Sequence, residues 1–179
     1  MREFNKLVRD FIPDIIERAG DVAEVRPYDA LEFRFALLEK LIEESDEFVE
    51  AGEYEVDALL SEAADCKEVY DYISAEWHVG LGALVIAPKR LRVVAADPRE
   101  ELARLARRML DASHDHAALV GATADYRNAF DIVINHFFLF DKLYERQIAR
   151  AKERGQFSRR LCLIRTYNKE ESTRMHAAP

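Results

Sequence analysis

The chain has 179 residues, of which 49% are hydrophobic and 34% are charged, and its formal net charge is −8. This composition is typical of a globular protein, and the length suits one domain with a substantial core. The negative charge argues against a general nucleic-acid-binding protein, which needs a basic surface, and no run of residues approaches the length of a membrane span. Because residues 1–20 also lack a signal-peptide pattern, we expect a cytoplasmic protein without a nucleic-acid or membrane partner.

The N-terminal segment combines two basic residues with the signal for a short helix. Residues 13–19 predict a helix, because a proline at its start suits the first turn, and Gly20 is a typical residue to end it. Lys6 and Arg9 precede this helix, and they are either ordinary surface charges or contacts to substrate phosphates. Residues 21–29 have a short and mixed pattern that predicts only an extended connector.

Two long amphipathic helices follow, over about residues 30–51 and 55–77. Asp29 is suited to cap the first helix, and Gly52 supplies its stop signal. Apolar residues recur at helical spacing along one side of each segment. The short connection between the segments predicts that these apolar stripes pack against each other in antiparallel fashion.

Each of these helices carries two carboxylates three residues apart, a spacing that places both on one face. They are Glu44 with Glu47 on the first helix and Glu62 with Asp65 on the second. Both pairs border the apolar stripe of their helix, so antiparallel packing would place four carboxylates along one seam. Such oxygen ligands suit Mg²⁺, with Mn²⁺ as the alternative, because a hard cation offsets their mutual repulsion. A glutamate-rich helix is often only a solvated face, but the matching second pair favours a metal site.

After the second long helix the pattern weakens into a connector, until Pro98 opens another helical stretch. A further helical pattern begins at Thr123 and is predicted to continue to Arg154, with Gly155 as its end. The final run, R-L-C-L-I-R-T-Y at residues 160–167, is short and β-prone. It is a candidate edge strand that pairs with the N-terminal segment.

Three pieces of the sequence carry a family resemblance. They are N-K-L-V-R-D-F-I-P-D-I-I from residue 5, K-L-I-E-E-S-D-E-F with S-E-A-A-D-C-K-E-V from residues 40 and 61, and A-K-E-R-G-Q-F from residue 151. Together they resemble the MazG-like all-α NTP pyrophosphohydrolases, and most closely the predicted house-cleaning branch, which begins N-K-L-V-R-D-K-I-P. The signature of that superfamily is E-E-x-x-E followed, after a gap, by E-x-x-D, and the motifs occur here in the family's order.

The resemblance implies Mg²⁺-dependent hydrolysis of a nucleoside triphosphate to a monophosphate and pyrophosphate, as in the house-cleaning of non-canonical nucleotides. It implies that four carboxylates bind the metal and take part in catalysis, namely Glu44, Glu47, Glu62 and Asp65. Glu43 belongs to the motif, and Glu47 is one candidate to position the attacking water. Four basic residues would contact the phosphates, namely Lys6, Arg9, Lys152 and Arg154.

The predicted fold is all-α, a MazG-like helical bundle with a helical insertion and a short terminal β-strand. Residues 1–179 would form a single domain, in which about 78–136 is an inserted segment that a minimal family member does not need. This segment is either a helical insertion or a degenerate second half that replaces a partner subunit, so a homo-oligomer and a single chain both stay open. Phe11 also departs from the branch, which usually has lysine at this position.

Two other functions stay open. One is a non-catalytic nucleotide- or metal-binding module whose extra segment serves a protein partner. The other is a related pyrophosphohydrolase that acts on a phosphoribosyl nucleotide of histidine synthesis. Nucleotide binding without any product would favour the binding module over either enzyme.

Overall fold

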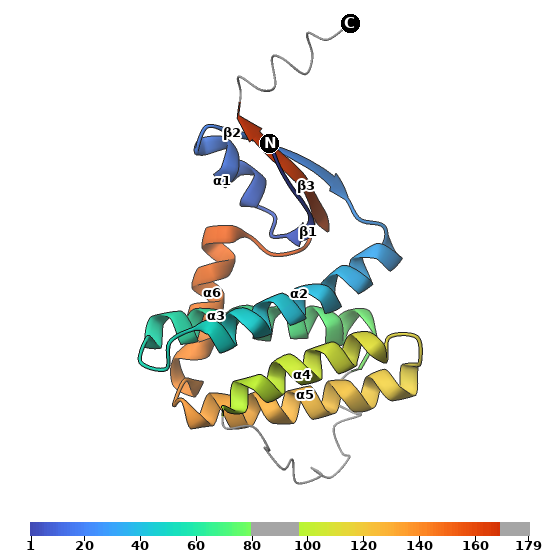
Figure 1. Ribbon diagram of the computed structural model, residues 1–179, viewed down its shortest axis with the longest axis vertical. Coiled ribbons are helices and arrows are strands. Elements are labelled where there is room, and N and C mark those ends of the chain that lie inside the picture. The colour runs from blue at the N-terminus through green and yellow to red at the C-terminus, as the bar shows by residue number, and fades with distance from the viewer. Residues whose placement is uncertain (80–96, 169–179) are drawn as a thin grey trace, which may run out of the picture. The chain divides into compact units, whose positions relative to one another are not determined.

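The computed structural model describes residues 1–79 and 97–168 (Figure 1). In these ranges the chain forms six helices and three strands, and it divides into two compact units. Unit 1 contains Met1–Ala36 and the described residues from Ala151 onward, and unit 2 contains the described residues of Leu37–Arg150. The single domain expected from the sequence stays a prediction.

Unit 1 is built around a three-stranded antiparallel sheet in the order β1-β3-β2. Its strands are β1 (Arg2–Val8), β2 (Asp21–Pro27) and β3 (Leu161–Asn168). Both β1 and β2 pair with β3 in antiparallel register, so they run parallel to each other, and helix α1 (Ile12–Arg18) connects them (Figure 1). The last strand of the described chain is therefore the central strand of the sheet.

Apolar side chains of the sheet and of α1 form the core of unit 1. Val8, Leu161 and Leu163 are buried at its centre, and Ile12 and Ile16 of α1 pack against them. Burying an aliphatic side chain of this size stabilises a fold by about 1.5–3 kcal/mol. This small core therefore holds α1 against the sheet.

The sheet contradicts the predicted all-α fold, in which the terminal run was the only, short β-strand. Residues 21–29, predicted as an extended connector, contain β2, and the terminal run is not an edge strand. Its pairing with the N-terminal segment is as predicted, with Leu7 opposite Cys162. The second pairing was missed because β2 has a mixed polar sequence, and its strand conformation depends on hydrogen bonds to a partner far along the chain.

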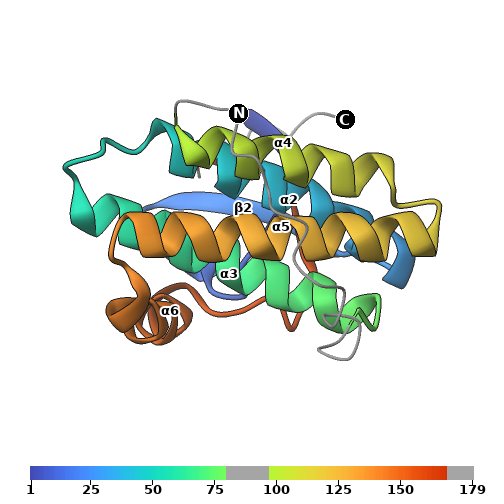
Figure 2. The ribbon, with the colours of Figure 1, turned by 90° about the horizontal axis from the view of Figure 1, so that it is seen from below.

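Unit 2 contains two pairs of antiparallel helices and the first part of α6 (Phe140–Arg154). Helix α2 (Ala30–Glu50), which contributes its residues from Leu37 onward, neighbours α3 (Val56–Glu76), and α4 (Pro98–Asp111) neighbours α5 (His116–His136) (Figures 1 and 2). The predicted ranges of α2 and α3 are confirmed within one residue at each end, and the predicted start of α4 is confirmed. The predicted cap of α2 is also present, because the preceding aspartate accepts two backbone N–H hydrogen bonds at 2.8 and 2.9 Å.

The interior of the bundle contains a small network of buried polar groups. Tyr126 of α5 is fully buried and stacks on Tyr70 of α3, with ring centroids 5.8 Å apart. Its hydroxyl lies 3.1 Å from Ser45 Oγ of α2, which in turn lies 3.9 Å from Cys66 Sγ of α3. Because a buried hydroxyl needs a hydrogen-bond partner, this network fixes α5 against both α2 and α3.

Arg99, in the first turn of α4, joins this helix to the C-terminal end of α2. Its Nη1 donates to the carbonyl oxygens of Phe48 at 3.1 Å and Ala51 at 2.6 Å. Its Nε and Nη2 donate to the carboxylate of Asp97, which also caps α4 by accepting from the Arg99 backbone N–H at 2.8 Å. The last carbonyls of a helix lack partners within it, so one side chain satisfies them and holds α4 against α2.

The single helix predicted from residue 123 to residue 154 is in fact two helices. Helix α5 ends at His136, and α6 spans Phe140–Arg154. Phe138 lies between them with a φ of 56°, a left-handed conformation that is typical of helix ends. No glycine or proline marks this break in the sequence, which explains why the aromatic run was read as continuous. Gly155, with a φ of 77°, ends α6 as predicted.

The predicted insertion at about 78–136 contains residues 80–96, which lie outside the described residues. The described rest of it includes α4 and α5, which contact α2 within the same chain. None of the helices in the described ranges has the length and apolar character needed to cross a membrane.

Candidate metal centre

Three of the four predicted carboxylates meet between α2 and α3. Glu44 and Glu47 of α2 and Glu62 of α3 each offer one oxygen, and these three oxygens lie within 4.8 Å of one another. Their spacing of three residues puts the two α2 glutamates on one helical face, and the antiparallel α3 brings the third glutamate to the same place. All three lie inside long helices, so the backbone that carries them is well defined.

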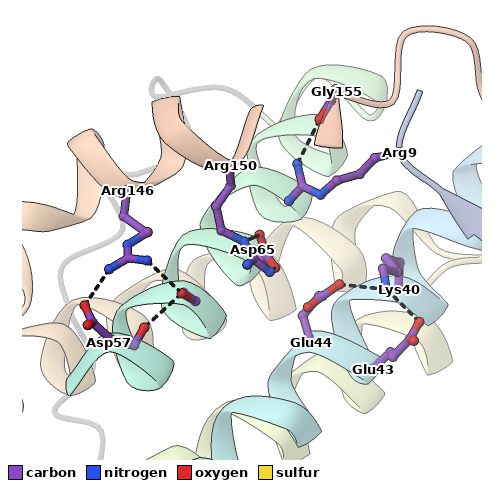
Figure 3. A network of polar contacts seen from close by, with 10 residues as sticks. Arg9, Lys40, Glu43, Glu44, Asp57, Asp65, Arg146, Arg150 and Gly155 are labelled. Carbon is purple, nitrogen blue, oxygen red and sulfur yellow. Dashed lines mark hydrogen bonds and ion pairs between the residues drawn. The ribbon is translucent and has the colours of Figure 1, made fainter. Parts of the chain in front are cut away.

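The three glutamates differ in burial and in the partners of their oxygens. Glu44 is 4% exposed, Glu62 is half-buried and Glu47 is exposed. The Oε1 of Glu44 forms an ion pair with Lys40 Nζ at 2.7 Å (Figure 3). The Oε2 atoms of Glu44 and Glu62 are buried and have no hydrogen-bond partner among the described residues. A buried carboxylate oxygen without a partner is costly, so both atoms require a donor or a cation.

The electrostatics of the cluster favour a bound cation. Burial raises the pKa of Glu62 to about 7, and the neighbouring carboxylates, Glu44 first among them, act in the same direction. Burial also raises the pKa of Glu44, although Lys40 opposes that shift. A divalent cation would offset the repulsion between these carboxylates and favour their ionised forms.

The donor set fits Mg²⁺ or Mn²⁺. Both ions prefer carboxylate oxygens, and Mg²⁺ commonly keeps several water ligands, which the exposed side of the cluster at Glu47 can accommodate. Lys40 offsets part of the negative charge of the cluster, and a divalent cation would offset more of it. Glu43, the remaining glutamate of the motif, accepts a hydrogen bond from the same Lys40 Nζ at 2.9 Å (Figure 3).

Asp65, the fourth predicted ligand, is not a member of this three-glutamate group. It is 2% exposed, and its carboxylate accepts hydrogen bonds from Arg150 of α6 (Figure 3). Oδ1 accepts from Nε at 2.8 Å, and Oδ2 accepts from Nη2. The role of Asp65 as a metal ligand stays a prediction.

The four predicted phosphate contacts all belong to unit 1. Arg9 is 5% exposed, and its Nη1 donates to Gly155 O at 3.3 Å (Figure 3). Its guanidinium lies 5.1 Å from the ring centroid of Phe157. The other three are more accessible, half-buried in the first case and exposed in the other two: Lys6, Lys152 and Arg154. Their contact with phosphate stays a prediction.

The first and last sequence motifs meet within unit 1. The Asp10 carboxylate accepts from the backbone N–H groups of Ser158 at 3.2 Å and Arg159 at 2.9 Å, and the Asp10 N–H donates to Gln156 O at 2.7 Å. Gly155 has a positive φ, and a Cβ at this position would lie 2.9 Å from Asp10 Cβ. The glycine is therefore required by the close approach of the two segments as well as by its own conformation.

Sequence reasoning missed two charged residues that contact the acidic residues of this site, Lys40 and Arg150. Lys40 precedes Glu44 by four residues, a spacing at which helical side chains form ion pairs, so this signal was present. Arg150 follows the buried Leu143 by seven residues, two turns along the same face of α6. That periodicity distinguishes it from the exposed Lys152 two residues later.

Comparisons with models of known protein families, with curated proteins and with solved structures find no match to this chain. The MazG-like resemblance therefore stays a prediction from three sequence motifs. The convergence of the three glutamates is a separate observation, because it follows from side-chain positions and burial.

Proposed function

We propose that this protein is a Mg²⁺-dependent nucleoside triphosphate pyrophosphohydrolase that acts on non-canonical nucleotides, with Mn²⁺ as an alternative cation. The observation that carries the proposal is the convergence of three glutamate oxygens, in a cluster where two buried carboxylate oxygens have no hydrogen-bond partner among the described residues. The motif order of the MazG-like family supports the reaction class. A metal cluster alone would be compatible with other phosphate chemistry.

In this reaction a water oxygen forms a bond to the α-phosphorus, and the bond from that phosphorus to the bridging α,β-oxygen breaks. Pyrophosphate leaves, the nucleoside monophosphate remains, and the protons of the water pass to solvent and products. A bound Mg²⁺ would supply neutralisation of the phosphate charge and a fixed orientation for the reacting groups.

The residues of the chain have separate tasks in this proposal. Glu44, Glu47 and Glu62 would hold the cation, and Lys40 engages Glu44 Oε1, so Oε2 is the atom that would bind the metal. Glu47 is the exposed member of the cluster, so its carboxylate is placed to accept a hydrogen bond from the attacking water.

Product analysis tests the proposal directly. The purified protein is incubated with Mg²⁺ and a panel of canonical and modified nucleoside triphosphates, and pyrophosphate is followed separately from orthophosphate. We expect pyrophosphate and the monophosphate in equal amounts, and loss of both when the metal is chelated. Nucleotide binding with no product under any of these conditions would instead assign a non-catalytic binding module.

Conservative variants connect the reaction to the cluster. Glu44→Gln and Glu62→Gln keep the size of each side chain but remove a charged ligand, so we expect them to abolish turnover while circular dichroism shows an intact helical fold. Glu39→Gln is the matched control, because this glutamate is exposed on the same helix outside the cluster. Full activity in both cluster variants would overturn the assignment of the site.

A further inference from the structure

We propose that Asp65 does not complete the metal site but orients Arg150, and that Arg150 contacts the phosphates of the bound nucleotide. This inference rests on the proposed function, since it assigns a phosphate-contacting residue to the same cluster. Of the four predicted carboxylates, Glu44, Glu47 and Glu62 would be metal ligands. The fourth, Asp65, would have a positioning role.

The geometry of the Arg150–Asp65 pair is the first support for this division. Nε and Nη2 of Arg150 donate to the two carboxylate oxygens of Asp65, so one edge of the guanidinium faces the aspartate (Figure 3). Both side chains are buried, with relative exposures of 9% for Arg150 and 2% for Asp65. Two parallel hydrogen bonds fix the plane of a guanidinium as well as its position.

The remaining donor of Arg150 is the second support. Nη1 has no hydrogen-bond acceptor in the part of the chain that the structure describes, and the side chain keeps an exposed fraction of 11%. Arg146, one turn earlier on α6, instead uses Nη2 on Asp57 at 2.6 Å and Nη1 on Ser61 Oγ at 3.3 Å (Figure 3). Of these two α6 arginines, Arg150 is therefore the one whose guanidinium keeps an Nη1 donor for a ligand.

Arg150 lies beside the metal cluster, because its partner Asp65 follows Glu62 by three residues on the same face of α3. Burial lowers the pKa of this guanidinium, but the hydrogen bonds to Asp65 and the negative charges of Glu62 and Glu44 raise it above its usual value. Arg150 therefore stays charged beside the acidic cluster. An arginine in this position offers a planar donor to a phosphate oxygen held at the cation.

The partners of the carboxylates explain why Asp65 is not needed as a ligand. Asp65 already has a cationic partner in Arg150, whereas Oε2 of Glu44 and Oε2 of Glu62 have no hydrogen-bond partner among the described residues. A fourth carboxylate at the metal would leave Arg150 without its orienting partner. With Asp65 paired to Arg150, the three glutamates would hold the cation, and phosphate oxygens and water would supply its other ligands.

Direct metal binding separates the two roles without any turnover. Mn²⁺ titrations followed by electron paramagnetic resonance should show that Glu62→Gln weakens binding by about tenfold or more, in line with the loss of a charged ligand. Asp65→Asn should change Mn²⁺ affinity by less than about threefold, because the amide is not a ligand in this scheme. Equal loss in the two variants would show that Asp65 is a metal ligand and would overturn the inference.

Nucleotide binding tests Arg150 itself, with a non-hydrolysable triphosphate analogue in the presence of Mg²⁺. Arg150→Gln should weaken binding of the triphosphate by about tenfold or more, as expected for loss of a charge-assisted hydrogen bond, and should affect the monophosphate much less. Arg150→Lys should restore part of the affinity, since it keeps the charge without the fork. Arg146→Gln, which removes a comparable arginine on the same helix, is the control and should bind both nucleotides normally.

The outcomes distinguish this inference from the proposed function. If wild-type protein binds no Mn²⁺, the metal centre itself fails. If Mn²⁺ binds but Arg150→Gln lowers affinity for triphosphate and monophosphate equally, or not at all, the role of Arg150 fails while the metal centre stands. Asp65→Asn provides the second measurement if Arg150→Gln does not fold, and it should show the same selective loss of triphosphate affinity.

Discussion

Two buried arginines of unit 2 both donate to an aspartate, but they differ in what the rest of the guanidinium contacts. Arg99 places Nε and Nη2 on Asp97 and Nη1 on two carbonyls at the end of α2, so each of its three nitrogens has a partner. Arg150 places Nε and Nη2 on Asp65, but its Nη1 has no acceptor among the described residues. An arginine satisfied within the fold contributes to stability, whereas one with an open donor beside an acidic cluster can bind an anion.

The largest expected effect is a loss of stability when the buried contacts of Arg99 are removed. Arg99→Gln should lower the free energy of unfolding by about 3 kcal/mol, because it leaves Asp97 without its partner and the α2 carbonyls without a donor. Urea denaturation followed by circular dichroism measures the loss. The KM of the folded variant for a triphosphate should stay at the wild-type value.

Arg104→Gln is the control for that experiment. Arg104 lies on the same helix and pairs with Glu101, but its side chain is 58% exposed, so its removal should cost less than about 1 kcal/mol. Equal losses in the two variants would show that the buried contacts of Arg99 carry no special stability.

If Asp65 orients Arg150 for triphosphate binding, the effects of changing the two residues should be coupled. Each single change, Arg150→Gln or Asp65→Asn, should raise the KM for the triphosphate by about tenfold, equivalent to about 1.4 kcal/mol. The double variant should raise it no further, because Asp65 acts through Arg150. Steady-state kinetics of the four proteins in a double-mutant cycle measures this coupling. Effects that multiply in the double variant would mean that the two residues act independently.

The parts of the fold that the sequence predicted are those encoded by local patterns. The apolar stripes, the cap at Asp29 and the stop at Gly52 placed α2 and α3 within one residue, because each signal lies inside or beside the helix that it describes. The same helical period predicted that Glu44 and Glu47 share a face and that Glu62 could meet them.

The parts that were missed depend on contacts between distant segments. Strand β2 is polar and irregular by itself, and its pairing with β3 is what makes it a strand. The contact of Arg150 with Asp65 joins residues 85 positions apart, so no local spacing specifies it. Phe138 ends α5 in a left-handed conformation without the glycine that usually marks such an end.

The smallest expected effect concerns the titration of Glu62 in the metal cluster. The pKa of Glu62 is raised from 4.5 to about 7 by burial and by neighbouring carboxylates, so the folded protein without metal holds a proton that the unfolded chain releases. The stability contribution of this group is therefore fully present below pH 4.5 and is lost as the pH rises through about 7. Because Glu62 is half-exposed and screened by solvent, we expect the loss to be about 1 kcal/mol.

Urea denaturation between pH 5 and 8, at about one pH unit per step, measures this loss in protein treated with a chelator. Glu62→Gln should flatten the pH dependence, since the amide does not titrate, and saturating Mg²⁺ should reverse the slope in the wild type by binding the ionised carboxylates. Asp65→Asn should keep the wild-type response to Mg²⁺ if Arg150 is the partner of that aspartate. Loss of the Mg²⁺ response in Asp65→Asn would show that Asp65 binds the metal. Asp65 would then not be reserved for orienting Arg150, and the functional contrast between Arg150 and Arg99 would no longer hold.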